Sequence, residues 1–107
     1  MAINYVSAQA ANVTSLTTVY NPTTSGVQAT LIGCLIANTT SVPVSATVTL
    51  TNATATTVTN IVYNLPIPVG NSLDIMNSAK IVMPLNYVLK VSATGSVDVT
   101  VSTIEVT

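Results

Sequence analysis

Residues 29–37 read ATLIGCLIA, a run that is apolar on both of its alternating faces. Residues 44–50 read VSATVTL, in which apolar and hydroxyl-bearing side chains alternate. A short continuous apolar run is typical of a strand buried on both sides, and an alternating run is typical of a half-solvated neighbour. Between them, residues 38–43 contain the residue types that reverse the chain direction. The sequence therefore predicts a central β-hairpin over residues 29–50, on which the other strands assemble.

Further short strands are expected on both sides of this hairpin. Before it, a short strand around residues 3–6 and another at 16–20 are separated by small and polar residues. After it, apolar or alternating runs predict strands at 57–65, 71–75, 79–83, 87–93 and 97–106. The predicted fold class is all-β, an antiparallel β-sandwich (jelly-roll- or Ig-like) of about seven to nine short strands, with a small barrel as the alternative. We expect a single domain over residues 1–107, in which residues 1–25 form an N-terminal arm or edge strands.

Two segments are expected to depart from regular strand geometry. In the last strand the apolar side chains Val97, Val99 and Val101 alternate, but the phase then shifts by one residue to Ile104 and Val106. Such a shift predicts a β-bulge near residues 102–103.

The second segment reads LPIPVG over residues 65–70, and its two prolines lack the amide that a sheet ladder needs. It is therefore predicted to leave the sheet as a crossover. Its members Pro66, Ile67, Pro68 and Val69 are the possible interface residues of the chain. Ile67 and Val69 would either cap the domain's own core or contact a neighbouring subunit, and the small size of the core favours the cap.

The composition is unusual for an enzyme. Charged residues make up 5% of the chain, and the formal net charge is −1, whereas charged residues are typically about 25%. The 107 residues include 19 Thr, 10 Ser and 17 Val, with no His, Phe or Trp. A surface with so few charges has little electrostatic protection against association. We therefore expect the chain to associate with copies of itself or with a partner, as a homo-oligomer.

The sequence offers no catalytic, cofactor-binding or metal-binding residues. Without histidine there is no Ser-His-Asp triad, and Cys34 lies in the most apolar run, where a packing thiol is expected rather than a nucleophile. The three acids, Asp74, Asp98 and Glu105, match no calcium-loop spacing and are expected to be solvated strand residues.

The same sequence argues against several partners and locations. Two lysines are too few for a nucleic-acid footprint. No run reaches the ~20 apolar residues of a membrane span, so neither nucleic acid nor membrane is an expected partner. The first residues show no secretory signal, and a lone cysteine fits synthesis in a reducing cytosol.

Several segments, taken in order, resemble a group of small tailed-phage virion proteins. In that group a strand of the form I-G-x-L-x-A-N-T-T precedes a crossover P-x-P-x-G-x-S-L and two strands reading roughly K-I-V-L and V-L-K-V. The similarity covers about residues 26–106. Residues 83–86, MPLN, replace an acidic turn of the group. The matching segments here are GV (26–27), LIGCLIANTT (31–40), 44–50, NLPIPVGNSLD (64–74), KIVM (80–83) and YVLKV (87–91).

This resemblance implies a non-enzymatic building block of a bacteriophage virion, made in the host cytoplasm. Its partners would be other virion proteins and copies of itself, on the capsid, neck or tail, as a capsid decoration or head-tail accessory protein. The resemblance supplies no catalytic residues. The alternative is a carbohydrate- or host-surface-binding β module of a phage fibre, although four scattered tyrosines and no tryptophan are few for such a site. An enzyme is the third and least favoured hypothesis.

Overall fold

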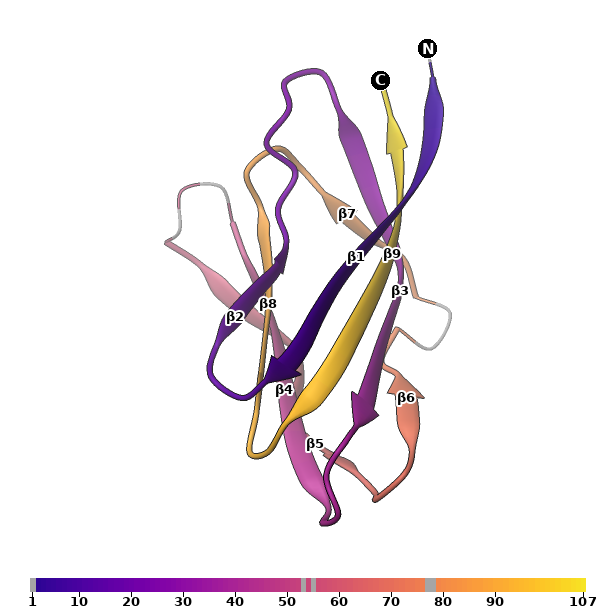
Figure 1. Ribbon diagram of the computed structural model, residues 1–107. Helices are drawn as coiled ribbons and strands as arrows, with labels where there is room; N and C mark the ends of the chain where they lie inside the picture. Colours follow the sequence, from indigo (N-terminus) through magenta and orange to yellow (C-terminus); the bar gives the residue numbers. More distant parts are fainter. Residues whose placement is uncertain (1, 53, 55, 77–78) are drawn as a thin grey trace.

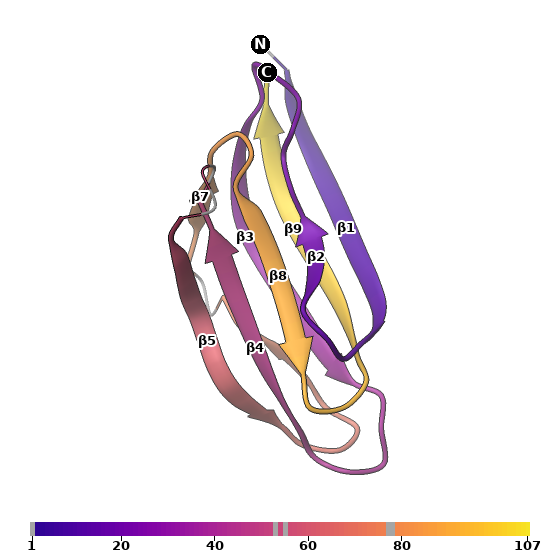
Figure 2. The ribbon, with the colours of Figure 1, turned by 90° about the vertical axis from the view of Figure 1, so that its left-hand side faces the viewer.

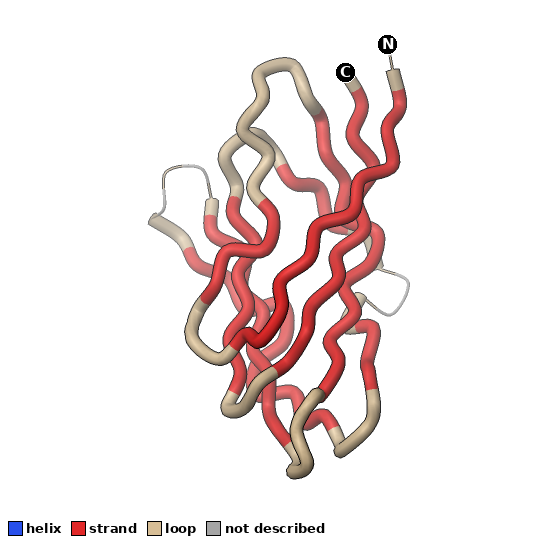
Figure 3. The backbone as a smooth tube through the Cα atoms, viewed as in Figure 1, coloured by secondary structure: helices blue, strands red, loops and turns tan. Residues whose placement is uncertain are grey.

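The computed structural model describes residues 2–52, 54, 56–76 and 79–107, which form strands and loops without a helix (Figures 1 and 3). The richness in Thr and Val explains this content, because β-branched side chains pack well on a pleated sheet and lose rotamer freedom in a helix. The nine strands are β1 (Ile3–Val13), β2 (Thr17–Tyr20), β3 (Gln28–Asn38), β4 (Val44–Thr51), β5 (Val58–Ile67), β6 (Ser72–Asp74), β7 (Ile81–Met83), β8 (Val88–Ala93) and β9 (Val97–Val106).

The strands form two antiparallel sheets that pack face to face, which confirms the predicted β-sandwich. One sheet has the order β1-β9-β3-β6, with β7 also paired to β3. The other has the order β2-β8-β4-β5. Figure 2 shows the second sheet in front of the first, in a molecule that measures 45 × 28 × 21 Å.

The order of pairing is nested along the chain. β4 pairs with β5, β3 with β6, β2 with β8 and β1 with β9, and every one of these pairs is antiparallel. The chain thus behaves as one long hairpin whose two arms are wrapped into two sheets. With β7 set aside, these eight strands follow the jelly-roll arrangement rather than the Ig arrangement.

Aliphatic side chains from both sheets fill the core. β3 and β9 supply Leu31, Ile36, Val99 and Val101, and the opposite sheet supplies Val48, Leu89, Val91 and Ile67, all with at most 1% of their surface exposed. Side chains of this kind stabilise by roughly 1.5–3 kcal/mol each on full burial. Tyr20 is the one aromatic residue among the buried core residues.

The predicted central hairpin is wrong, because β3 and β4 lie in opposite sheets. The connection between them crosses the sandwich, and the side chain of Asn38 holds this corner. Its amide nitrogen donates to the carbonyl oxygens of Val42 (2.9 Å) and Ile67 (3.1 Å), and its Oδ1 accepts from the backbone N–H of Thr40 (2.9 Å). Turn residues indicate that a chain reverses, but a reversal within a sheet and a crossing between sheets use the same residue types.

The expectation that residues 29–37 are buried on both sides is also wrong. The inward face of β3 is buried at Leu31, Cys34 and Ile36, whereas Leu35 on the other face is 43% exposed. β3 is central in its sheet, but no layer covers the outer face of that sheet in the described chain. The apolar residues of the second face therefore remain at the surface.

The N-terminal strand is longer than predicted. β1 continues from Ile3 to Val13 through the segment that was expected to be a connection. Small apolar side chains, Ala8 and Ala10, alternate there with polar Ser7 and Gln9. This weak alternation is enough to form a strand because β1 pairs with β9. β1 and β2 are edge strands of the two sheets.

The expected bulge near residues 102–103 is not in β9. The inward alternation of β9 continues from Val101 to the buried hydroxyl residue Thr103. The extra residue lies instead on β3, where the register shifts between Leu31 and Gly33. Ile104 and Val106 therefore point to the outer face of the sheet, because strand side chains alternate between faces.

Candidate interaction surfaces

The predicted crossover begins later than expected, because β5 extends to Ile67. Pro66 pairs with Ser45 and Ile67 pairs with Val44 on β4. The prediction that proline ends the pairing here is wrong, since β5 is an edge strand and a proline can sit there with its nitrogen directed to solvent. After Ile67 the chain turns at residues 68–71, where the N–H of Asn71 donates to the carbonyl of Pro68 at 3.2 Å.

The four possible interface residues divide into two groups. Ile67 is fully buried in the core of its own chain. Pro66 and Pro68 are exposed, and Val69 is 49% exposed. Only these three can contact another molecule while the fold is intact.

A second surface lies on the outer face of the sheet that contains β1, β9, β3 and β7. Register places Tyr5 opposite Ile104, Ile104 opposite Thr30, and Thr30 opposite Val82, so these side chains form one row across four strands. Tyr5 is 81% exposed and Val82 is 68% exposed. We call this row, together with the neighbouring exposed Ile3, the apolar row.

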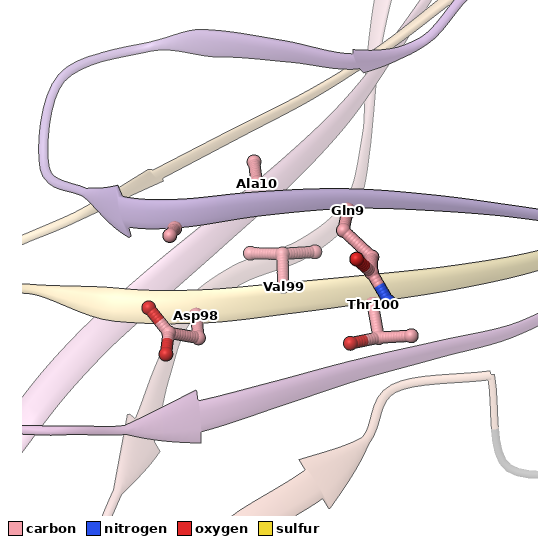
Figure 4. Close-up of a pocket in the computed structure, with 6 residues that line it drawn as sticks. Gln9, Ala10, Asp98, Val99 and Thr100 are labelled. Atoms are coloured by element: carbon pink, nitrogen blue, oxygen red, sulfur yellow. The ribbon is translucent and has the colours of Figure 1, made fainter.

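The opposite end of the same face is polar. Asp98 and Asp74 lie there, and a shallow hollow of about 400 Å³ between β1 and β9 is lined by Gln9, Ala10, Ala11, Asp98, Val99 and Thr100. Figure 4 shows the side chain of Gln9 extending over β9 toward Thr100. Asp98 accepts a hydrogen bond from the backbone N–H of Asn12 at 3.0 Å. This hydrogen bond ties the Asp98 carboxylate to the end of β1.

Cys34 occupies the core, as expected for a packing thiol. Its side chain is 1% exposed, and burial, followed by the nearby carboxylate of Asp74, raises the pKa of the thiol from 9.0 to about 12. The thiolate is the nucleophilic form of cysteine. At neutral pH this residue is therefore protonated and inaccessible.

The three acids are dispersed and do not converge. Asp74 accepts from the backbone N–H groups of Met76 (3.1 Å) and Cys34 (3.4 Å). Asp98 accepts a hydrogen bond from the backbone at the end of β1, and Glu105 points into the sandwich toward Tyr20. Across the described residues no group of three or more His, Cys, Asp or Glu is placed to hold a metal ion.

Sequence reasoning missed the apolar row. It placed a bulge before Ile104 and Val106, which would keep them on the core face, and it assigned Tyr5 to a short first strand around residues 3–6 without a face. The signal was nevertheless present, since Ile3, Tyr5, Ile104 and Val106 continue the two-residue alternation of their strands on the outward phase.

Comparison of the chain with models of protein families, with curated proteins and with solved structures finds no match in any of the three. Within the described ranges the structure also has no helix long and apolar enough to cross a membrane.

Proposed function

We propose that the chain is a non-enzymatic structural component of a bacteriophage virion that assembles in multiple copies on the capsid, neck or tail. The observation that carries the proposal is the apolar row, in which exposed Tyr5 and Val82 lie at the two ends of a line of side chains that includes no charged residue. Contiguous apolar side chains on an exposed sheet face are typical of a contact surface.

Two further features support this role. The segments quoted above resemble small tailed-phage virion proteins, and the jelly-roll arrangement occurs in viral capsid domains. That arrangement also occurs in lectins, so the fold does not decide by itself. Fibre modules that bind carbohydrate use aromatic platforms, but the two most exposed tyrosines, Tyr5 and Tyr63, lie on strands of different sheets.

The experiment measures incorporation into particles. Lysates that contain the chain are fractionated on a density gradient, and the chain is detected by antibody in the fractions that hold DNA-filled particles. We expect co-sedimentation of the wild-type chain. Tyr5→Lys should reduce incorporation, because it places a charge in the apolar row. The control Tyr63→Lys changes a tyrosine of similar exposure on the other sheet and should leave incorporation unchanged.

Two results would contradict the proposal. One is a chain that remains in the soluble fraction while particles form normally. The other is a purified chain that binds host-surface glycans without being part of any particle, which would favour the fibre-module alternative.

A further inference from the structure

The backbone of β1 presents a regular set of free hydrogen-bonding groups at the edge of its sheet. Ala2 and Thr107 exchange both backbone hydrogen bonds, at 3.0 and 2.9 Å. In an antiparallel ladder such pairs alternate with non-bonded ones. The backbone N–H and C=O groups of the even-numbered residues of β1 therefore point toward β9. The same groups of Ile3, Tyr5, Ser7 and Gln9 point away from it.

No strand of the described chain pairs with this free side of β1 (Figure 2). None of the four residues takes part in the described backbone hydrogen bonds outside the ladders. The side chains of Tyr5, Ser7 and Gln9 are exposed. The edge is thus accessible to another strand.

The other sheet edges are protected and β1 is not. β2 has 4 residues, and β6 and β7 have 3 each, so these edges are short. β5 is long, but it contains Pro66, a left-handed Asn64 with φ of 51°, and two register shifts against β4. β1 has 11 residues with no proline, glycine or charged side chain, and its register on β9 is regular from Ile3 to Ala10. Natural proteins usually block an edge of this kind by charge, proline, bulge or short length.

We propose that β1 pairs antiparallel with β1 of a second copy of this chain, which joins the two sheets into one across a two-fold axis. The free backbone N–H and C=O groups belong to odd-numbered residues, so odd-numbered residues of the two copies must lie opposite one another. The regular part of β1 ends before Asn12, which is left-handed (φ 57°), and the longest strand overlap within this limit places Ser7 opposite Ser7 of the second copy. Tyr5 then lies opposite Gln9, and Ile3 opposite Ala11. This inference rests on the proposed function, because it specifies how copies of the subunit associate.

The pairing brings no like charges together. Neither strand carries a charged side chain, and Asp98 lies beside the far end of β1. In the proposed register the two copies of Asp98 are separated by roughly 30 Å along the strands. A second copy therefore meets a complementary backbone edge without electrostatic repulsion, and it leaves the inward side chains of β1 in place.

The test is the oligomeric state of the purified chain by sedimentation at micromolar concentration. We expect a dimer for the wild-type chain. Ser7→Pro removes an N–H that points away from β9, so it spares the ladder within the chain but blocks the new one. It should raise the dimer dissociation constant by at least about tenfold. The matched control Ser7→Thr keeps the N–H and should remain a dimer.

A second variant guards against misfolding of the proline variant. Ser7→Lys keeps the backbone intact but places two like charges opposite each other at the axis. It should also weaken the dimer, and added salt should restore part of the affinity. Circular dichroism establishes that each variant is folded.

A wild-type chain that stays monomeric, or a folded Ser7→Pro variant that dimerises like wild type, would overturn the β1 pairing. A monomeric chain that still enters particles contradicts this inference alone. A dimer that is absent from particles contradicts the proposed function alone.

Discussion

The phenol of Tyr20 on β2 donates a hydrogen bond to the carboxylate of Glu105 on β9, with an O···O distance of 2.5 Å, and so links the two sheets near the chain termini. At the other end of the sandwich, the amide of Asn38 on β3 donates to the carbonyl of Ile67 on β5. These two polar contacts join sheets whose interface is otherwise mostly aliphatic. Each contact makes a prediction about stability.

The Tyr20 contact predicts a loss of stability at high pH. Burial, followed by the hydrogen bond to Glu105, raises the pKa of Tyr20 from 10.0 to about 12. Folding therefore favours the protonated phenol. This contribution is fully present below pH 10 and is lost as the pH rises toward 12. Denaturant titrations of Tyr20→Phe should show a smaller decline in unfolding free energy over this range than wild type.

Tyr63→Phe, at an exposed position, is the control and should follow the wild-type profile. An identical decline in Tyr20→Phe and wild type would show that the phenol does not carry the effect.

The Asn38 corner is predicted to be sensitive to a change of one atom. Asn38→Asp replaces the donor to the Val42 and Ile67 carbonyls with an acceptor, in a side chain that is 6% exposed. A buried polar group without its partner costs about 1–3 kcal/mol, and more for a charged group. The denaturation midpoint should fall accordingly at pH 7. Asn60→Asp, on an exposed position of β5, makes the same chemical change and should have little effect; equal losses would contradict the corner's role.

Much of the fold could be predicted from the sequence because strand patterns are local. The strands at β6, β7 and β8 fall within residues 71–75, 79–83 and 87–93, as predicted. The sheet to which a strand belongs is not local information. The β3–β4 connection depends on the contact between Asn38 and Ile67, which are 29 residues apart, so its turn residues were interpreted as a hairpin.

The candidate surfaces were harder to predict for the same reason. The row from Tyr5 to Val82 joins residues from both ends of the chain through register on β9 and β3. A shift of one residue in the inward–outward alternation of β9 decides whether Ile104 belongs to the core or to the surface. The burial of Cys34, by contrast, follows from its immediate apolar neighbours and was predicted.

Cys34 should react very slowly with thiol reagents in the native protein. Its side chain is 1% exposed, and its pKa of about 12 leaves little thiolate at neutral pH. Labelling then requires opening of the fold, so the rate with a maleimide should be at least about a thousandfold below that of the unfolded chain. An added cysteine in Thr100→Cys, at an exposed position of β9, is the positive control. Rapid labelling of native Cys34 would contradict its placement in the core. Cys34→Ala should lower the free energy of unfolding by on the order of 1 kcal/mol.

Gly95 is predicted to tolerate no side chain. A Cβ at this position would lie 2.6 Å from Cγ1 of Val44, which is buried at the start of β4. Overpacking of this kind typically costs about 1–3 kcal/mol, so Gly95→Ala should lower the denaturation midpoint. Gly33→Ala is the matched control, because the nearest atom to its Cβ would be Ser102 Cβ at an ordinary 3.7 Å. A Gly95→Ala variant as stable as Gly33→Ala would show that the turn between β8 and β9 shifts freely.

The end of β5 and the turn after it place a residue needed for stability and a residue available for contact two positions apart. Ile67 is fully buried and Val69 is 49% exposed. Ile67→Ser leaves a cavity and places a hydroxyl in the core, at a cost of several kcal/mol. In a domain of this size the melting temperature should fall by more than about 10 °C. Val69→Ser should leave the melting temperature nearly unchanged, because its side chain is already half in water.

If this segment is a contact surface in the assembly, Val69→Ser alone should reduce incorporation into particles without loss of stability. Normal incorporation of Val69→Ser would remove the segment as an interface and leave the apolar row and the β1 edge as the proposed contact surfaces.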